Sequence, residues 1–259
     1  MTDVLKSDID DGICTLTLNR PDALNALDGS LVEALGERFD ELRYDDEVRV
    51  VILTGAGDRA FCAGADLVER RSMSEQQVRR RIDDYREVFG RIAGVPKPTI
   101  CAINGYAFGG GLEMALACDL RVVDEETRVG LTELRLGIIP GAGGTQRLPR
   151  LIGLARAKEL IFTGAKITGR RAAELGLVNY AVSSDEVVDR ARSLADDMLG
   201  SAPIAIAQAK KAIDTGTQVD LTSGLELEST AYAVTLPTED RQEGLAAFKE
   251  DREPEFKGE

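Results

Sequence analysis

The feature that most constrains the fold of this chain is the run at residues 48–54, apolar except for Arg49 and Thr54, which follows an amphipathic segment. A largely apolar run of this length fits a buried strand. The segment before it begins after Asp28, a residue type suited to cap a helix N-terminus. Its apolar side chains recur at helical spacing, namely Leu31, Leu35, Phe39 and Leu42. Because a strand at 13–18 precedes the helix, the order strand, helix, buried strand predicts an α/β layer architecture.

The remaining segments before residue 140 continue this alternation. The pair Asp11-Gly12 predicts a tight turn that joins the strand at 13–18 to one at 4–9. Ser74 and the residues after it have the form of a capping box and open a second helix, which Pro96 and Pro98 end. The apolar face of this helix consists of Val78, Ile82, Tyr85, Phe89 and Ile92. Strands at 99–103 and 120–123, with the start of a helix at 112–117 between them, complete this part.

Beyond Pro140 the patterns are mainly helical, with helices expected near 146–150, near 156–162, after Thr168 and over 185–199. A chain of 259 residues is long enough for one large domain or two small ones. No linker rich in proline or serine divides it, and no repeat is evident. We therefore expect one domain with a helical C-terminal subregion.

The chain contains no histidine, which excludes several kinds of chemistry. Ser-His-Asp and Cys-His nucleophile systems, histidine-ligated zinc and an imidazole general base all require that residue. Proton transfer near neutral pH is left mainly to carboxylate, lysine, tyrosine or cysteine.

Charge and cysteine content indicate the environment of the protein. With 45 acidic against 32 basic residues, the net charge of −13 argues against binding to nucleic acid or an anionic membrane. Cys14, Cys62, Cys101 and Cys118 lack metal-binding spacing and are expected to be reduced, buried thiols. Residues 1–6 lack the apolar core of a signal peptide, and the longest uncharged stretch, 98–112, is too short to span a membrane. These features predict a cytoplasmic location.

A glycine-rich segment at residues 55–60 (GAGDRA) matches the dinucleotide-binding pattern of a Rossmann fold. That function needs a helix beginning within the glycines, but Phe61 and Cys62 follow and favour helix poorly. We expect a loop that reverses the chain direction.

Glu113 is the only charged side chain in residues 99–118. Burying a lone carboxylate is costly unless it is paired or has a chemical task. Its predicted place in the first turn of a helix favours the ionised form, which suits a general base. Acidic residues are also common in first helical turns for stability alone, and the sequence leaves both interpretations open.

Three successive glycines at 109–111 precede Glu113. Without side chains, the backbone can approach a ligand closely, and N–H groups at the helix start can bind negative charge. Such a site would serve a carbonyl oxygen that becomes an oxyanion. A simple flexible turn is the alternative.

Two further charged features have ordinary structural interpretations. Taken alone, Glu133 is expected to be a surface or salt-bridged acid, with Arg135 on the same strand face. The arginines of one basic run predict a solvated helix face that could attract a phosphate group; they are Arg70, Arg71, Arg79, Arg80 and Arg81.

Several ordered motifs resemble the enoyl-CoA hydratase/isomerase (crotonase) family. They lie at residues 61–67 (FCAGADL), 104–113 (NGYAFGGGLE) and 137–148 (GIIPGAGGTQRL). The similarity extends nearly end to end, from residues 19–27 (NRPDALNAL) to 248–256. The resemblance implies an α/β spiral of strand-strand-helix turns over residues 1–200. It also implies a helical C-terminal region at 201–259 that forms a homotrimer or a dimer of trimers.

The resemblance also implies an enzyme and its site. The reaction would be hydration of the 2,3 double bond of a 2-trans-enoyl-CoA, as in fatty acid metabolism. The implied catalytic residues are Glu113, Glu133, Gly141 as a water-positioning residue, and the oxyanion-hole N–H donors Ala65 and Gly110. The implied substrate contacts are Ala23, Leu24, Ala26, Ala63, Ala65, Asp66, Leu67, Gly109, Gly110 and Pro140. The coenzyme A is carried by the substrate, so neither a separate cofactor nor a metal is implied.

Some alternatives stay open at this level. A double-bond isomerase or another acyl-CoA lyase would use the same fold. A non-catalytic RNA-binding or scaffold protein is disfavoured by the acidic charge, and an NAD-dependent dehydrogenase by the form of the 55–60 segment. The basic residue that would hold a CoA phosphate could be Lys249, Arg252 or Lys257.

Overall fold

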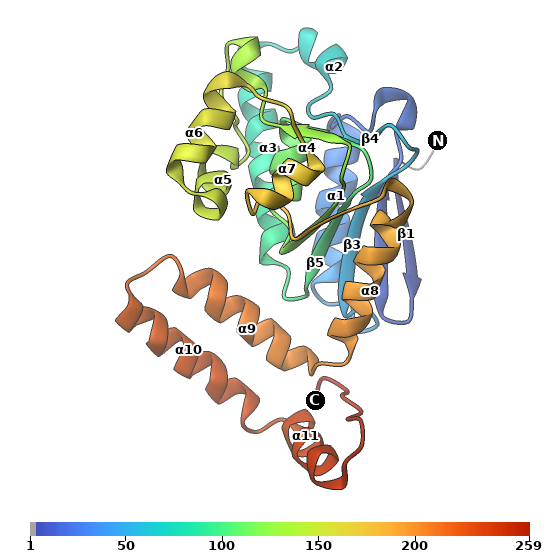
Figure 1. Ribbon diagram of the computed structural model, residues 1–259, viewed down its shortest axis with the longest axis vertical. Helices are drawn as coiled ribbons and strands as arrows, with labels where there is room; N and C mark the ends of the chain where they lie inside the picture. The colour runs from blue at the N-terminus through green and yellow to red at the C-terminus, as the bar shows by residue number, and fades with distance from the viewer. Residues whose placement is uncertain (1–3) are drawn as a thin grey trace.

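The computed structural model describes residues 4–259, whose strands form two sheets (Figure 1). The first three residues of the N-terminal segment inspected for a signal peptide lie outside this range. The six strands of the first sheet, in spatial order, are β1 (Leu5–Asp10), β2 (Ile13–Leu18), β3 (Val50–Gly55), β5 (Thr99–Ile103), β7 (Leu120–Asp124) and β10 (Tyr180–Val182). The four of the second are β4 (Ala60–Cys62), β6 (Tyr106–Phe108), β8 (Arg128–Gly130) and β9 (Ile167–Thr168).

From β3 to β8, consecutive strands alternate between the two sheets, which makes this part of the chain a spiral. β3 is followed by β4, β5 by β6 and β7 by β8, and in each pair the first strand belongs to the larger sheet. Strands one turn apart pair in parallel, as β3 does with β5 and β6 with β8. The expected α/β spiral of strand-strand-helix turns is therefore confirmed.

Helices fill the intervals between the strands. Before the last sheet strand they are α1 (Gly29–Leu42), α2 (Leu67–Arg71), α3 (Glu75–Gly94), α4 (Gly110–Ala115), α5 (Gly144–Ile152), α6 (Leu154–Thr163) and α7 (Gly169–Glu174). Short 3-10 turns occur at η1 (Pro21–Ala23), η2 (Glu133–Leu136) and η3 (Ser184–Glu186). After β10 come α8 (Val187–Leu199), α9 (Pro203–Gly216), α10 (Leu221–Thr235) and α11 (Glu239–Glu250).

The local signals in the sequence place these elements well. Asp28 accepts a hydrogen bond from the N–H of Leu31 at 2.9 Å and caps α1 as predicted. Ser74 and Gln77 form both bonds of the expected capping box at the start of α3. The hairpin turn has positive φ at Asp11 (48°) and Gly12 (79°), the conformation that a tight hairpin turn requires.

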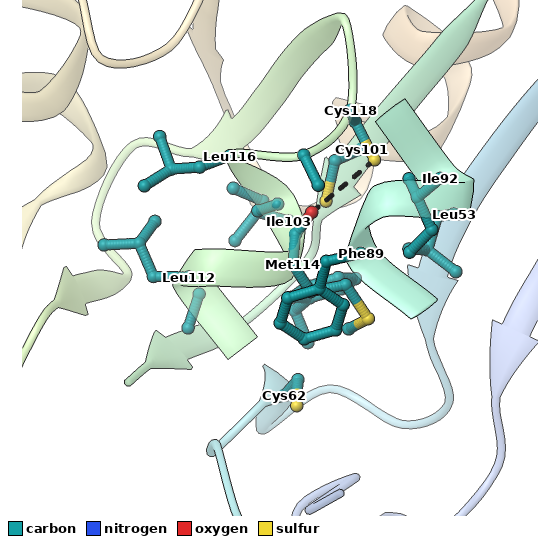
Figure 2. Packing of buried hydrophobic residues seen from close by; sticks show 14 of the residues in the cluster. Leu53, Cys62, Phe89, Ile92, Cys101, Ile103, Leu112, Met114, Leu116 and Cys118 are labelled. Carbon is teal, nitrogen blue, oxygen red and sulfur yellow. Dashed lines mark hydrogen bonds between the residues drawn. The ribbon is translucent and has the colours of Figure 1, made fainter. Parts of the chain in front are cut away.

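The helix α4 is inserted into the core (Figure 2). Leu112 and Met114 are at most 1% exposed and pack in one cluster with Phe89 of α3, Leu53 of β3 and Ile103 of β5. Burying each large apolar side chain contributes about 1.5–3 kcal/mol, so this short helix is held by packing rather than by its own length.

All four cysteines are free and buried, as expected. Cys101 and Cys118 lie in the same cluster as α4 (Figure 2). Burial raises the pKa of Cys62 to about 12, which keeps that thiol protonated and unreactive.

A buried arginine holds the other end of α4. Arg121 is 5% exposed and donates to the carbonyl oxygens of Leu177 at 2.9 Å, Cys118 at 2.7 Å and Ala115 at 3.4 Å. Ala115 is the last residue of α4, so a cation lies where the negative end of the helix dipole is exposed. Packing and this cation together fix the direction of the helix.

The helices α9, α10 and α11 form a C-terminal arm that projects from the sheets (Figure 1). α8 ends at Leu199 and α9 begins at Pro203, beside the boundary expected at residue 200. Lys210 of α9 joins the arm to the core through a 2.7 Å ion pair with Asp119 and a 3.1 Å bond to the carbonyl of Lys97. Within residues 4–259, no helix is both long and apolar enough to cross a membrane.

The arm leaves many large apolar side chains in solvent. Six of these side chains, each with its exposed fraction, are Ile213 (64%), Leu221 (78%), Leu225 (53%), Tyr232 (65%), Leu245 (60%) and Phe248 (89%). No residue of α9 is buried, and in α10 only Ala231 is. Many large apolar side chains exposed on one arm indicate an interaction surface.

We expect this arm to associate with other copies of the chain in a closed trimer or a dimer of trimers. Light scattering coupled to size exclusion at micromolar concentration should give three or six times the mass of one chain. Leu225→Asp combined with Tyr232→Asp should shift that mass downward, because both substitutions place charge on the exposed apolar surface of α10. A wild-type mass equal to a single chain would contradict the expectation.

Candidate active site

A cavity of about 130 Å³ brings together segments that are far apart in the sequence. It lies among the segment that joins β4 to α2, one side of α3, the start of α4, and the chain from η2 to residue 142. The predicted site residues that line it are Ala63, Ala65, Leu67, Gly109, Gly110, Glu113, Glu133 and Gly141. A larger hollow of about 980 Å³ lies between the core and α9, but no predicted site residue lines it.

Two backbone N–H groups meet at this cavity. The N–H of Leu27 donates to Gly64 O at 2.8 Å and that of Asp66 to Leu27 O at 3.0 Å, which fixes the backbone on both sides of Ala65. A Cβ built on Gly110 would lie 3.8 Å from the nitrogen of Ala65, so the two segments are adjacent. Within residues 4–259 neither Ala65 N–H nor Gly110 N–H donates to another residue. Both donors are available to an oxygen in the cavity.

The close approach of these two segments depends on Gly64. Its φ is +98°, and a Cβ there would be 2.7 Å from Phe108 O and 3.4 Å from Gly110 N. Any side chain at position 64 would push the two donor segments apart.

Glu113 lies in the first turn of α4, as predicted, and is only 3% exposed. Its Oε1 accepts hydrogen bonds from the N–H groups of Ala142 and Gly144, both at 2.8 Å. Burial raises the pKa of Glu113, while these two N–H groups and the guanidinium of Arg147 act in the opposite direction. The helix position was expected to favour the ionised form, but the cost of burial outweighs it.

Glu133 differs from the sequence expectation. It begins the 3-10 turn η2 rather than lying on a strand, and Arg135 donates instead to Thr163 O at 2.6 Å. The side chain is 8% exposed, and neither carboxyl oxygen has a hydrogen-bond partner within residues 4–259. Oε1 lies 3.2 Å from the position that a Cβ on Gly109 would occupy, so a larger residue there would crowd it.

The environment of Glu133 strongly favours the protonated form. Burial raises the pKa of Glu133 to about 7, and the charge of the nearby Glu113 adds to the rise. The N–H groups of Ala142 and Gly144 stabilise the charged form of Glu113, whereas neither carboxyl oxygen of Glu133 has a partner from another residue within residues 4–259. The cavity thus holds two carboxyl groups in different environments.

Other predicted contacts lie outside this cavity. Ala23, Leu24 and Ala26 do not line it, and Pro140 lines a neighbouring surface hollow together with Gly141. The carboxylate of Asp66 caps α2 by accepting from Val68 N at 3.0 Å and pairs with Arg20 at 3.0 Å. Its side chain is therefore occupied in holding the loop that carries Ala65.

The basic residues considered for a CoA phosphate are distant from the cavity within one chain. Lys249 is on α11 and Lys257 follows it, at the opposite end of the molecule from α2 (Figure 1). Arg252 pairs with Glu243 at 2.6 Å and with Glu250 at 2.8 Å.

The glycine-rich segment after β3 is a reversing loop, as expected. β3 ends at Gly55, and β4 begins at Ala60 with no helix between them. A Cβ on Gly55 would be 2.6 Å from Phe61 O, so glycine is required there by close packing and not by a nucleotide.

Nine of the cavity-lining residues were not identified as site residues from the sequence, and three of them illustrate why. Tyr85 was placed on the buried face of α3, Arg70 on a solvated face, and Ile139 was part of a motif without a role. Only the helical spacing of Tyr85 with Ile82 gave any signal, since both face the same side of α3. The inward position of Arg70 depends on how α2 packs.

Comparison with known proteins shows the family and the fold of the chain. Residues 8–259 match the enoyl-CoA hydratase/isomerase family. Human enoyl-CoA hydratase domain-containing protein 2, named as mitochondrial, is 51% identical over 253 residues, covering 96% of this chain and 87% of that protein. Human methylglutaconyl-CoA hydratase, also named as mitochondrial, is 46% identical over 252 residues, covering 96% and 74%. The crystal structure of enoyl-CoA hydratase from Bacillus anthracis has a TM-score of 0.98 at 47% identity, covering 99% of this chain and 100% of that chain.

We predict that Glu133→Gln stabilises the fold at alkaline pH. Glu133 keeps its proton to about pH 7 in the folded protein but loses it near pH 4.5 when unfolded. Between these values the folded state binds more protons, so wild-type stability falls as pH rises, by at most roughly 3 kcal/mol. Glutamine is neutral throughout and avoids this loss.

Urea unfolding at pH 5.5 and pH 8.5 measures this effect. The stability advantage of the variant should grow by roughly 2 kcal/mol between the two pH values. An equal stability advantage of the variant at both pH values would mean that burial does not raise the pKa of Glu133.

Proposed function

Because this chain belongs to the enoyl-CoA hydratase/isomerase family, we propose that it adds water across the 2,3 double bond of a 2-trans-enoyl-CoA. The family expected from the sequence motifs is confirmed, and the chain is an enzyme of the hydratase/isomerase class. The observation that carries the finer proposal is the pair of buried carboxyl groups, Glu113 and Glu133, in one cavity with two unpaired N–H donors.

The two N–H groups of Ala65 and Gly110 act on the thioester oxygen. Addition of water to a conjugated thioester moves negative charge onto that oxygen as an enolate forms. Donors fixed in a buried cavity stabilise this charge more than they stabilise the neutral substrate, so they lower the barrier.

Glu113 is the general base that activates water. The hydrogen bonds from Ala142 and Gly144 hold its Oε1 in place and favour its charged form. The carboxylate accepts a proton as the oxygen of water bonds to the β-carbon. Gly141 lines the same cavity and would help to position that water.

Glu133 is the general acid. With a pKa of about 7, it keeps a large protonated fraction near neutral pH and donates that proton to the α-carbon as the enolate collapses. The product has gained one proton from Glu133 and hydroxide from water. Proton exchange with solvent returns both carboxyl groups to their starting states.

Isomerisation of the double bond is the second candidate, since the family includes isomerases by name. Moving a proton between two carbons needs one carboxyl group, whereas hydration uses two. The presence of both in the cavity favours hydration. The substrate, the pathway and the cytoplasmic location are predictions, and the two human relatives reported above are named as mitochondrial.

We predict that Glu113→Gln and Glu133→Gln each lower turnover of crotonyl-CoA by about 10²–10⁴-fold, the usual effect of losing a general acid or base. The effects should be strongly non-additive, because both groups act on one transition state. Loss of the conjugated thioester absorbance measures the rate. A folded variant that keeps more than about a tenth of wild-type turnover would exclude that residue from the chemistry.

We predict that Gly110→Pro abolishes polarisation of the thioester, because proline lacks the N–H. Gly110 is the first residue of α4, where proline is compatible with a helix. Loss of one oxyanion donor costs roughly 2.7–4 kcal/mol of transition-state stabilisation.

The matched control is Gly110→Ala, which adds a Cβ 3.2 Å from Leu27 Cδ1 but keeps the donor. Circular dichroism should show both variants folded. If proline lowers the rate no more than alanine does, the donor has no part in the reaction.

A further inference from the structure

Arg70 is the one positively charged residue that lines the cavity, among the residues that the structure describes. It is the fourth residue of α2, the helix that begins two residues after the oxyanion donor Ala65. The other charged residues of the lining are the two carboxyl groups, Glu113 and Glu133. The mechanism proposed above uses those two and leaves Arg70 without a role.

The guanidinium of Arg70 has no partner within residues 4–259, although acidic groups are near. Asp66 pairs with Arg20 at 3.0 Å, and Glu69 pairs with Arg81 at 3.0 Å. The neighbouring acids are therefore already neutralised by other arginines. A half-buried guanidinium left uncompensated at a cavity wall is suited to an anionic group of a ligand.

The remaining walls indicate which part of a ligand reaches Arg70. The cavity is lined by the apolar side chains Leu67, Ile82, Leu136, Ile138 and Ile139. Tyr85 also lines it, but its hydroxyl donates to Leu27 O at 3.0 Å and is occupied. An acyl chain that extends past the two glutamates meets apolar walls and a single free cation.

The size of the cavity limits the length of that chain. Its volume of about 130 Å³ is small beside the roughly 300–1,000 Å³ of typical ligand pockets. Arg70 also borders the adjoining small pocket between α2 and α3, so it lies at one boundary of the cavity. A short acyl group would place its far end at this boundary.

We propose that the substrates are short 2-enoyl-CoA thioesters whose acyl chain ends in a carboxylate, and that Arg70 binds this carboxylate. This inference rests on the proposed hydration. The carboxylate would supply the negative charge that Arg70 lacks, and the oxyanion donors and the two glutamates would act at the other end of the acyl group. A substrate with a terminal methyl group makes no charge-assisted contact with the guanidinium and should therefore react less efficiently than the carboxylate.

The test compares two substrates that differ only at the chain end. Glutaconyl-CoA carries a terminal carboxylate, and trans-2-pentenoyl-CoA carries a methyl group in its place. Wild-type kcat/KM should favour glutaconyl-CoA. Arg70→Met should lower kcat/KM for glutaconyl-CoA by roughly 10–100-fold, the loss expected for one charge-assisted contact. The same variant should change kcat/KM for pentenoyl-CoA by no more than about twofold.

Two variants serve as controls. Arg71→Met removes an arginine that is next in sequence but exposed and outside the cavity lining, so it should leave the substrate preference unchanged. Arg70→Lys keeps the charge and should restore part of the preference. Thermal melts by circular dichroism establish that each variant is folded.

Binding of saturated thioesters separates this inference from the proposed reaction. Glutaryl-CoA and pentanoyl-CoA cannot be hydrated, and calorimetry gives their Kd values directly. Tighter binding of glutaryl-CoA that is lost in Arg70→Met supports the carboxylate site, even if wild type hydrates neither enoyl substrate and the proposed reaction fails. Equal weakening of both thioesters in Arg70→Met would mean that Arg70 contacts the shared coenzyme, for example a phosphate, and would overturn the proposal. Equal wild-type affinity for both would also overturn it.

Discussion

The two hydrogen bonds from the backbone of Ala142 and Gly144 to Glu113 Oε1 are the interaction on which the site depends. They join the start of α4, which follows β5 and β6, to residues 142–144, which come after β7 and β8. The same contact orients the carboxyl group of Glu113 and fixes the chain beside Gly141, which lines the cavity. It adds to the pairing of β6 with β8 and the 3.0 Å bond from Gly109 N to Gly130 O, which already place the segments of the two carboxyl groups side by side.

The protein places α4 so that this contact can form. Apolar packing surrounds the helix (Figure 2), and Arg121 donates to the carbonyl oxygen of its last residue, Ala115, at the opposite end. One short helix therefore has a buried charge at each end. Glu113 at its start accepts hydrogen bonds from N–H groups, and Arg121 at its end donates to carbonyl oxygens. Each charge is matched by backbone dipoles, which cannot swing away as a side-chain partner can.

Local features of the chain were predictable from the sequence because their causes are local. The cap at Asp28, the capping box at Ser74 and the hairpin at Asp11 each depend on a few neighbouring residues. Glu113 could be singled out because it is the one charge in an apolar stretch. The glycines at 109–111 suggested an oxyanion site as one of two interpretations, whereas the roles expected for Ala65 and Gly141 came only from resemblance to a family.

The environments of Glu133 and Arg70 were not predictable in the same way. Each has charged neighbours in the sequence that suggest an ordinary surface position, and each faces the cavity because of how distant elements pack. Arg135 turns to Thr163 O and leaves Glu133 alone, while Arg20 and Arg81 neutralise the acids around Arg70. Tertiary contacts decide which acidic group each arginine pairs with, and the spacing of residues in the sequence does not reveal those contacts.

The C-terminal position of the arm has a consequence for biosynthesis. Every strand of both sheets, and α8, precede residue 200, so they leave the ribosome before the arm does. Domains tend to fold as their residues emerge from the ribosome, and the core can therefore complete both sheets while the apolar surface of α9, α10 and α11 is still unsynthesised. Nascent chains on one messenger are thus kept from associating through that surface until the rest of each chain is already folded.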